Sequence, residues 1–277
     1  MDLKKVTSMN RDAWNEAMEY HRKAKKQEYL VKFTEPTFIQ LHPVEQDVFH
    51  ALQLPGKRVA HVCCNNGIEL ISLTRLGAHQ CVGFDITDAA IQDAREYNTI
   101  AGTDCTFIQT DVYDLNPLAS EWYQQFDFVY ISVGALCWLP DLKELFQVCA
   151  ALLKEEGHLV MFEGHPYVNM FAFPGEEGFD SGHPLNPVYS YFRKEEFVFT
   201  DGIDYVGGEI YESKPHVNFS HTMGEILNGM IANHLCLTQM QEYPLDITTI
   251  FPEFEKGQKV PLSVLIVGQK ITPPLRS

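Results

Sequence analysis

Residues 58–67 read Arg58-Val59-Ala60-His61-Val62-Cys63-Cys64-Asn65-Asn66-Gly67, a largely apolar run that ends in a polar turn. The run predicts a buried strand that enters a tight turn, and Gly83-Phe84-Asp85 ends a second such strand about twenty residues later. In a βαβ unit the turn after the first strand lets the backbone approach a ligand, and an acid that ends the second strand accepts hydrogen bonds from ribose hydroxyls. This pairing indicates a site for a nucleotide-type cofactor.

Strands and helices alternate on both sides of this turn. The patterns predict strands over 57–63, 80–85, 105–109, 126–133, 157–163, 235–243 and 260–269, and helices over 67–76, 87–97 and 142–153. Thr222-Met223-Gly224-Glu225 has the pattern of a capping box that opens a helix to about Asn233. Strands separated by helices at this spacing predict an α/β fold with a doubly wound parallel sheet.

The alternation breaks between Gly164 and His221, where Gly, Pro and aromatic residues are frequent. Residues 189–192 and 197–199 have the pattern of short antiparallel strands. Because a long insertion inside a compact domain is usually functional, we expect residues 164–219 to form a lid over the substrate. Its aromatic side chains favour an apolar or aromatic small molecule, and they are equally typical of a homodimer surface.

Charge and composition narrow the class of protein. The 277 residues carry a formal net charge of -16. A protein that binds a nucleic-acid duplex or an anionic membrane surface needs a basic face, so neither is expected as a partner. The basic segment from Lys4 to Lys26 is expected to be the solvated face of an amphipathic helix that turns Trp14, Met18 and Tyr29 inward. No secretion signal or bilayer-spanning run is found, and the seven cysteines lack zinc-type spacing, so we expect a cytoplasmic protein.

Five segments together resemble class I S-adenosylmethionine-dependent methyltransferases. They are His61–Gly67, Gly83–Asp85, Gln109–Val112, Phe126–Val129 and Leu152–Leu159, which follow the order and spacing of that family. The likeness covers residues 44–163 and 222–270. It implies a Rossmann-like, seven-stranded sheet whose last strand is antiparallel, with a lid insertion after the fifth strand.

The resemblance also implies a domain organisation and an activity. Residues 1–277 would form a single methyltransferase domain, with a helical cap over 1–43, a cofactor-binding core over 44–163 and 220–277, and the lid over 164–219. The activity would be transfer of a methyl group from S-adenosylmethionine to a small-molecule acceptor, with S-adenosylhomocysteine as the product.

The cofactor turn departs from the family pattern acid-x-Gly-x-Gly-x-Gly. His61 stands in place of the acid, Cys63 and Asn65 stand in place of two glycines, and Gly67 is retained. Because Asn is the non-glycine residue that best adopts a positive φ, Asn65 and Asn66 are expected to shape the turn. Methyltransferase-like sequences with a Cys-Asn or Cys-His turn before the last glycine are similar to this one.

The resemblance assigns cofactor roles residue by residue. Asp85 would bind the ribose diol, or else cap the following helix, and Asp111 would accept the adenine amino group, or else form an Asx turn. Trp14 and Tyr20 or Tyr29 would close over the cofactor, or else pack in the core. The complete set of expected cofactor-binding residues is His61, Cys63, Asn65, Gly67, Asp85, Ile86, Asp111, Val112, Ser132, Trp14 and Tyr29.

A sulfonium already makes its methyl group electrophilic, so the protein need only align the acceptor with that group and activate it. A hydroxyl or ammonium acceptor also requires a base. Glu163, His165 and His221 are the candidates, since they lie where the carboxyl ends of the strands open into the insertion. The same acid and histidines, with His216, lack a tight ligand motif, so no metal is expected.

Other functions remain open at this point. An NAD(P)-dependent oxidoreductase would use the same first two strands, but the Gly-x-Gly-x-x-Gly turn that seats a pyrophosphate is absent. A noncatalytic cofactor-binding or interaction module is compatible with the loss of two glycines. A nucleic-acid methyltransferase is disfavoured by the charge and by Ser132-Val133-Gly134-Ala135 in place of Asn-Pro-Pro-aromatic. The acceptor atom is not determined by the fold.

Overall fold

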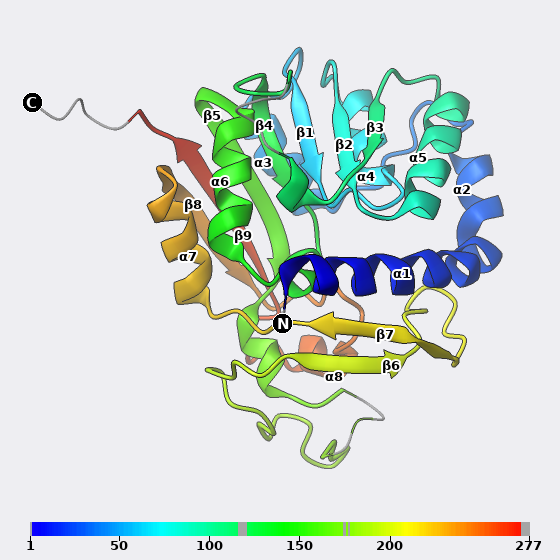
Figure 1. Cartoon of the computed structure of the whole chain (residues 1–277), viewed down its shortest axis with the longest axis vertical. Coiled ribbons are helices and arrows are strands. Elements are labelled where there is room, and N and C mark those ends of the chain that lie inside the picture. Colours follow the sequence, from blue (N-terminus) through cyan, green and yellow to red (C-terminus); the bar gives the residue numbers. More distant parts are fainter. Residues whose placement is uncertain (1, 116–120, 174–175, 177, 273–277) are drawn as a thin grey trace, which may run out of the picture.

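A seven-stranded sheet forms the centre of the computed structural model, which describes residues 2–115, 121–173, 176 and 178–272 (Figure 1). The strand order is β3-β2-β1-β4-β5-β9-β8. The strands are β1 (Val59–Val62), β2 (Val82–Asp85), β3 (Thr106–Gln109), β4 (Phe126–Ile131), β5 (Leu153–Gly164), β8 (Leu235–Tyr243) and β9 (Ser263–Lys270). The first five are parallel, and β9 is antiparallel to both β5 and β8. The predicted Rossmann-like sheet with an antiparallel last strand is confirmed.

Helices cover both faces of this sheet. One face packs against α3 (Pro43–Ala51), α4 (Ile68–Arg75) and α5 (Asp88–Ala101), which contribute Phe49, Leu70 and Tyr97 to one core cluster. The other face packs against α6 (Leu142–Leu152) and α7 (Met223–Ala232), which contribute Phe146 and Met230 to a second cluster. Both faces of β1 and β2 are therefore buried, as parallel strands require.

The start of one helix was predicted from the sequence, and the start of another was not. The capping box at Thr222 is present, with Thr222 Oγ1 accepting from Glu225 N at 3.1 Å, so this prediction is confirmed. Helix α3 was not predicted, because its N-cap is His42, whose ring nitrogen replaces the usual hydroxyl or carboxylate and accepts from Val44 N. The short helix α8 (Pro252–Gly257) was also not predicted.

The amino-terminal segment crosses the carboxyl ends of the strands. It consists of α1 (Leu3–His21), one π-helical turn (Arg22–Lys26) and α2 (Gln27–Lys32). Figure 1 shows α1 lying between this edge of the sheet and a hairpin of β6 (Phe197–Asp201) and β7 (Glu212–Asn218). Asn10 joins the two, because its side chain accepts from Val217 N at 2.8 Å and donates to Val217 O at 3.0 Å.

The insertion differs in part from its prediction. The strand expected at 197–199 is present, but the strand expected at 189–192 is wrong, since the backbone turns there and Arg193 N donates to Ser190 O at 3.1 Å. Residues 174, 175 and 177 of the insertion lie outside the described residues. In the described part of the chain, no helix is long and apolar enough to cross a membrane.

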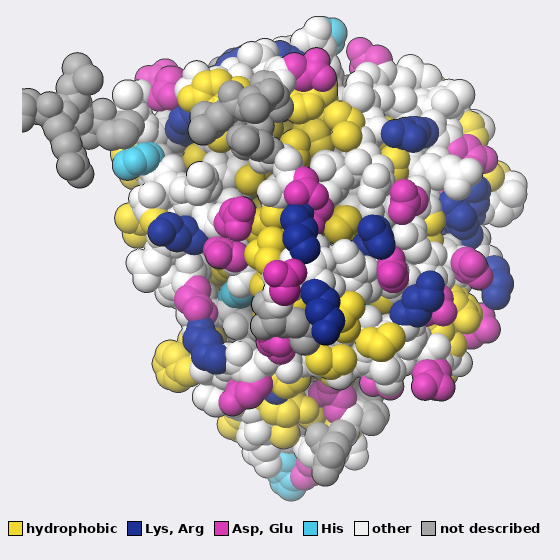
Figure 2. All heavy atoms as spheres, viewed as in Figure 1, with side chains coloured by type: hydrophobic (Ala, Val, Ile, Leu, Met, Phe, Trp, Pro, Cys, Tyr) yellow, Lys and Arg dark blue, Asp and Glu magenta, His cyan; other side chains and the backbone are white. Residues whose placement is uncertain are grey.

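The face that carries α1 has a mixed surface. Figure 2 shows Lys and Arg side chains interspersed with Asp and Glu across it. Lys25 and Glu28 form one such half-buried pair, with Nζ and Oε2 2.8 Å apart. The predicted solvated face holds for Lys4, Lys5 and Lys23, which are exposed. It is wrong for Arg22 and Lys26, which are half-buried against Asp93.

Candidate functional site

A cavity of about 660 Å³ lies between the carboxyl ends of the strands, α1 and the β6–β7 hairpin. Its wall includes the turn after β1, the end of β2, the segment after β3 and the segment after β4. Strand β1 pairs with β2 on one side and with β4 on the other, so the chain changes direction across the sheet at this point. Open α/β sheets bind ligands at such a switch point.

The turn after β1 uses left-handed backbone at every second residue. Cys63, Asn65 and Gly67 have φ of +57°, +47° and +71°, and these are the three positions where the family pattern has glycines. The prediction that Asn65 shapes the turn is confirmed, and its Oδ1 accepts from Asn66 N at 2.7 Å. The left-handed Cys63 was not predicted. The turn keeps its backbone shape without two of its glycines.

Asp85 ties this turn to the next helix. Its Oδ2 accepts from Asn65 N at 2.7 Å and its Oδ1 accepts from Thr87 N at 2.8 Å. Burial raises the pKa of Asp85, and these backbone donors oppose that rise. Thr87 occupies the predicted N-cap position of α5 but makes no capping hydrogen bond with its side chain. Asp85 and Ile86 both line the cavity.

Asp111 lies beside Asp85 at the same edge of the sheet. Its Oδ1 accepts from Tyr113 N at 3.0 Å, which is the Asx-turn geometry, and its Oδ2 lies 3.3 Å from Lys4 Nζ of α1. Asp111 and Val112 line the cavity together. The turn role and a ligand-binding role are therefore compatible at this residue.

His61 lies inside the sheet and not in the cavity wall. It is fully buried in β1, its Nε2 is 3.1 Å from Ser132 Oγ, and its ring centroid is 4.6 Å from that of Tyr130. Burial lowers the pKa of His61 to about 3, so the ring is neutral at physiological pH. The position where the family pattern has an acid therefore carries no negative charge. Ser132, its partner, does line the cavity.

Glu163 holds the segment that follows β4. Its Oε1 accepts from Ala135 N at 2.8 Å and Leu136 N at 2.9 Å, and its Oε2 accepts from Gly134 N at 2.7 Å and Gly164 N at 3.2 Å. Burial raises the pKa of Glu163 to about 7 against the effect of these donors. Four backbone donors occupy a carboxylate that has about four lone-pair sites. Glu163 therefore fixes one wall of the cavity.

The two candidate histidines have different surroundings. His221 lines the cavity, and its Nε2 donates to Leu139 O at 2.8 Å, which leaves Nδ1 as the proton acceptor. Burial lowers the pKa of His221. His165 is not part of the cavity wall, since its Nδ1 accepts from Tyr167 N at 3.1 Å and its Nε2 lies 2.9 Å from Glu242 Oε1.

The structure does not assemble the four residues considered for a metal. His216 packs against Phe199 with ring centroids 5.7 Å apart and is not part of the cavity wall that His221 lines. Among the described residues, no group of three or more His, Cys, Asp or Glu side chains comes together as metal ligands.

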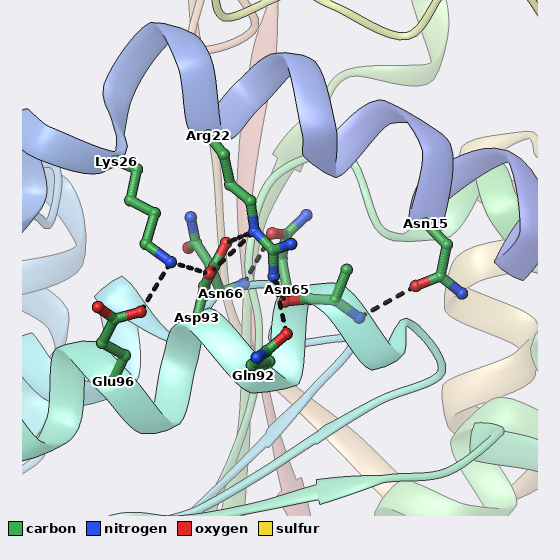
Figure 3. A network of polar contacts seen from close by, with 9 residues as sticks. Asn15, Arg22, Lys26, Asn65, Asn66, Gln92, Asp93 and Glu96 are labelled. Carbon is green, nitrogen blue, oxygen red and sulfur yellow. Dashed lines mark hydrogen bonds and ion pairs between the residues drawn. The ribbon is translucent and has the colours of Figure 1, made fainter.

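Helix α1 and the π-helical turn are fastened over the cavity by polar contacts with α5 (Figure 3). Arg22 Nε lies 3.0 and 2.8 Å from the two carboxylate oxygens of Asp93, and Lys26 Nζ donates to Asp93 Oδ1 at 2.9 Å. Asn15 Oδ1 accepts from Ala89 N at 3.0 Å at the other end of the contact. These contacts could not be predicted from the sequence, because the residues that form them are about seventy positions apart in the chain.

The aromatic residues expected to close the site do reach the cavity. Trp14 and Tyr29 both line it, and Trp14 packs edge-on against Trp138 with ring centroids 5.2 Å apart. Tyr29 also packs near Tyr97, with ring centroids 5.9 Å apart. Met18 is 1% exposed, as its predicted inward position requires. Tyr20 instead stacks on Tyr211 and is not in the cavity wall.

The methyltransferase domain family matches residues 60–161, which run from β1 to β5 and include the cofactor turn, Asp85 and Asp111. The chain contains a methyltransferase domain. The resemblance predicted from the sequence is therefore confirmed at the level of domain family and fold.

Curated relatives of this methyltransferase domain include ubiquinone biosynthesis O-methyltransferases. That of Hahella chejuensis is 30% identical over 141 residues, which are 50% of this chain and 57% of the relative. That of Proteus mirabilis is 33% identical over 104 residues, which are 38% of this chain and 40% of the relative. The chain thus spans about half the length of the curated relatives it matches.

Solved structures share the fold over most of the chain. An S-adenosylmethionine-dependent methyltransferase from Mesorhizobium loti has a TM-score of 0.57 at 22% identity, covering 82% of this chain and 97% of its own. Geranyl diphosphate C-methyltransferase from Streptomyces coelicolor A3(2), in complex with Mg²⁺, geranyl diphosphate and S-adenosyl-L-homocysteine, has a TM-score of 0.52 at 13% identity, covering 82% of this chain and 79% of its own. These likenesses establish the methyltransferase fold.

Three residues of the site were not found by sequence reasoning. Lys4, Glu69 and Arg193 all bear on the cavity: Lys4 through Asp111, and the other two as part of its wall. Glu69 lies in the first turn of α4, where an acid is usually explained by the helix dipole. Only the tertiary structure shows that Glu69 is part of the cavity wall.

Proposed function

We propose that this protein transfers a methyl group from S-adenosylmethionine to a small-molecule acceptor. The observation that carries the proposal is one cavity that joins the left-handed turn 63–67, Asp85 and Asp111 at the switch point of a methyltransferase domain. Its volume of about 660 Å³ lies within the range of about 300–1,000 Å³ common for ligand sites.

The cavity wall suggests how the cofactor lies. Asp85 binds the ribose diol, Ile86 and Val112 enclose the adenine, and Asp111 accepts from its amino group. The turn and Ser132 contact the methionine end, and Trp14 and Tyr29 shield it from water. When bound, S-adenosylmethionine supplies an electrophilic methyl group, so the protein contributes alignment and exclusion of water.

His221 is the group best placed to activate an acceptor. Nε2 donates to Leu139 O, so Nδ1 carries the lone pair of the neutral ring, and burial favours that neutral form by lowering the pKa of His221. Trp138 and Phe199 line the cavity with it, which favours an aromatic hydroxyl as the acceptor. The curated relatives are named as O-methyltransferases, in agreement with an oxygen acceptor. Glu163 positions the wall and His165 supports the start of the insertion.

Calorimetric titration with S-adenosylmethionine and S-adenosylhomocysteine tests the proposal. We expect micromolar binding to the wild type and loss of binding in Asp85→Ala, with Asp104→Asn as an exposed acidic control. Circular dichroism checks that the variants are folded. A folded wild type that binds neither ligand but binds NADH would refute the proposal in favour of an oxidoreductase.

Three further expectations accompany the proposal. The lid role of residues 164–219, a homodimer and a cytoplasmic location stay predictions. The aromatic insertion supports the first, because Phe171, Phe197 and Phe199 line the cavity.

A further inference from the structure

The cofactor turn leaves a cationic ligand without its expected partner. S-adenosylmethionine has an ammonium group as well as a sulfonium, and a buried cation requires an acid or other acceptor. His61 cannot serve, because it is neutral and lies outside the cavity wall. Another acceptor in the cavity wall is therefore needed for the ammonium group, and a carboxylate would also neutralise its charge.

Six carboxylates line the cavity in the described part of the chain: Glu69, Asp85, Asp93, Asp111, Glu163 and Glu176. Five of them already have partners. Asp85 and Glu163 accept from backbone N–H groups, as does Glu176 from Phe173 N at 2.8 Å. Asp93 pairs with Arg22 and Lys26, and Asp111 pairs with Lys4 and Tyr113 N.

Glu69 is the exception. Within the described residues, no other residue forms a hydrogen bond or ion pair with its carboxyl group, whose hydrogen-bond partner is its own backbone N–H. It is half-buried, and it lies two residues after Gly67 in the first turn of α4, directly beyond the cofactor turn. A carboxyl group that lies at a cavity without an internal partner is available to a cationic ligand.

The surroundings of Glu69 suit a cation. The Glu69 carboxylate helps to raise the pKa of the half-buried Tyr29 and of Tyr205, so both phenols lie near its carboxyl group. Asp85 also acts on Tyr205, which places this group at the cofactor end of the cavity. Aromatic rings beside a carboxylate bind ammonium and sulfonium groups through cation–π and ionic attraction.

We propose that the Glu69 carboxylate binds the ammonium group of the methionine moiety, in place of the acid that the turn lacks at position 61. The inference rests on the proposed function, because it assumes that this cofactor enters the cavity. Cations already present do not satisfy Glu69: Arg22 pairs with Asp93 and Lys25 with Glu28. Arg193, the other described Lys or Arg in the cavity wall, stacks on Phe197 of β6.

The Glu69 carboxyl group should lose a proton when the ligand binds. Burial raises the pKa of Glu69 to about 8, so its carboxyl group is largely neutral at pH 7 and ionises when an ammonium arrives. The titratable groups that face it are Glu45 of α3, Tyr29 of α2, Tyr130 of β4, Cys64 of the turn and Tyr205 of the β6–β7 connection. Binding should therefore release close to one proton from Glu69 at pH 7 and none above about pH 9.

The experiment compares wild type, Glu69→Gln and the control Glu144→Gln, an exposed acid in the first turn of α6, by calorimetry at pH 7, in phosphate and in Tris buffer, whose ionisation enthalpies differ. The ligands are S-adenosylhomocysteine, which has the ammonium group, and 5′-methylthioadenosine, which lacks the amino-acid end. Glu69→Gln should lose about 10- to 100-fold in affinity for the first ligand, keep its affinity for the second, and no longer release the proton. Glu144→Gln should behave as the wild type, because Glu144 lies outside the cavity wall.

Equal affinity and equal proton release in wild type and Glu69→Gln would overturn the inference while leaving the proposed function intact. Equal losses for both ligands would also overturn it, since Glu69 would then act on the shape of the turn. S-adenosylmethionine is titrated in parallel, and a loss confined to it would assign Glu69 to the sulfonium and overturn the ammonium assignment. A wild type that binds no S-adenosyl ligand would instead refute the proposed function.

Discussion

Replacing Gly67 with alanine should be among the most damaging small changes to the cofactor turn. Gly67 has φ of +71° at the N-cap of α4, and a Cβ added there would lie 2.6 Å from Phe107 Cζ and in contact with Cε1. Left-handed backbone costs a non-glycine residue about 1–2 kcal/mol. Overpacking against a buried ring costs about 1–3 kcal/mol more, so Gly67→Ala should lower the free energy of unfolding by about 2–5 kcal/mol.

A matched control separates the two contributions. Gly102 has φ of +65° at the C-cap of α5, and a Cβ added there would meet no atom within 4 Å. Gly102→Ala should therefore cost only the backbone contribution, and both variants gain equally from reduced freedom of the unfolded chain. Urea unfolding should show Gly67→Ala to be about 1–3 kcal/mol worse than Gly102→Ala.

A second substitution tests the cause. In a Phe107→Leu background, the extra cost of Gly67→Ala should fall toward that of Gly102→Ala, because the aromatic ring that clashes has been removed. Equal unfolding free energies for the two alanine variants, within about 0.5 kcal/mol, would refute the steric reasoning. Affinity for S-adenosylhomocysteine, measured on the same proteins, reports whether the turn has moved.

Three other predictions follow from single contacts. Asp93→Asn should lower the free energy of unfolding in urea by about 1–3 kcal/mol, because Asp93 is 1% exposed while its partners Arg22 and Lys26 are 28% and 26% exposed. Unchanged stability and unchanged proteolysis of residues 2–26 would show that these contacts do not hold the amino-terminal segment in place. The pKa of His61 is about 3 in the folded protein against a usual 6.5, so the free energy of unfolding should fall by about 1.4 kcal/mol per pH unit as the pH drops from 6.5 toward 3. His61→Phe should flatten this acid limb of the stability–pH curve. An unchanged slope in the variant would disprove the assignment to His61. His221→Asn should lower kcat by about 10²–10⁴-fold with unchanged affinity for S-adenosylhomocysteine, and since burial lowers its pKa, the acid limb of wild-type kcat should lie below the usual histidine range; full activity in the variant would remove His221 from the mechanism.

Sequence patterns predicted the fold well for segments that pair as regular strands in the central sheet. Strand β8 has the predicted bounds, and β3 differs from its prediction by one residue. The lid region was predicted less well, because the pattern at 189–192 is aromatic and typical of a strand but has no partner strand. Helix α3 was missed because its cap is a histidine.

The candidate site divides in the same manner. The structure brings Asp85, Asp111 and the turn to one cavity, because the carboxyl ends of parallel strands meet at one edge of the sheet. Their roles in cofactor binding stay predictions. The separate roles of Glu163 and His221 were not predictable, since each depends on backbone groups from elsewhere: Glu163 accepts from residues 134–136, and His221 donates to Leu139.

Periodic burial and turn chemistry are local properties, so the sequence by itself determined the sheet, the helices other than α3 and α8 that cover it, and the edge where a nucleotide-type cofactor would lie. The tertiary structure alone decided which charges remain unpaired, because pairing depends on segments that are distant in the chain. It neutralised His61 by burial, occupied Glu163 with backbone donors, and left Glu69 facing the cavity without a partner among the other described residues. Desolvation and hydrogen bonding thus set the chemistry of His61 and Glu163, whose positions the sequence had indicated, and of Glu69, whose position it had not.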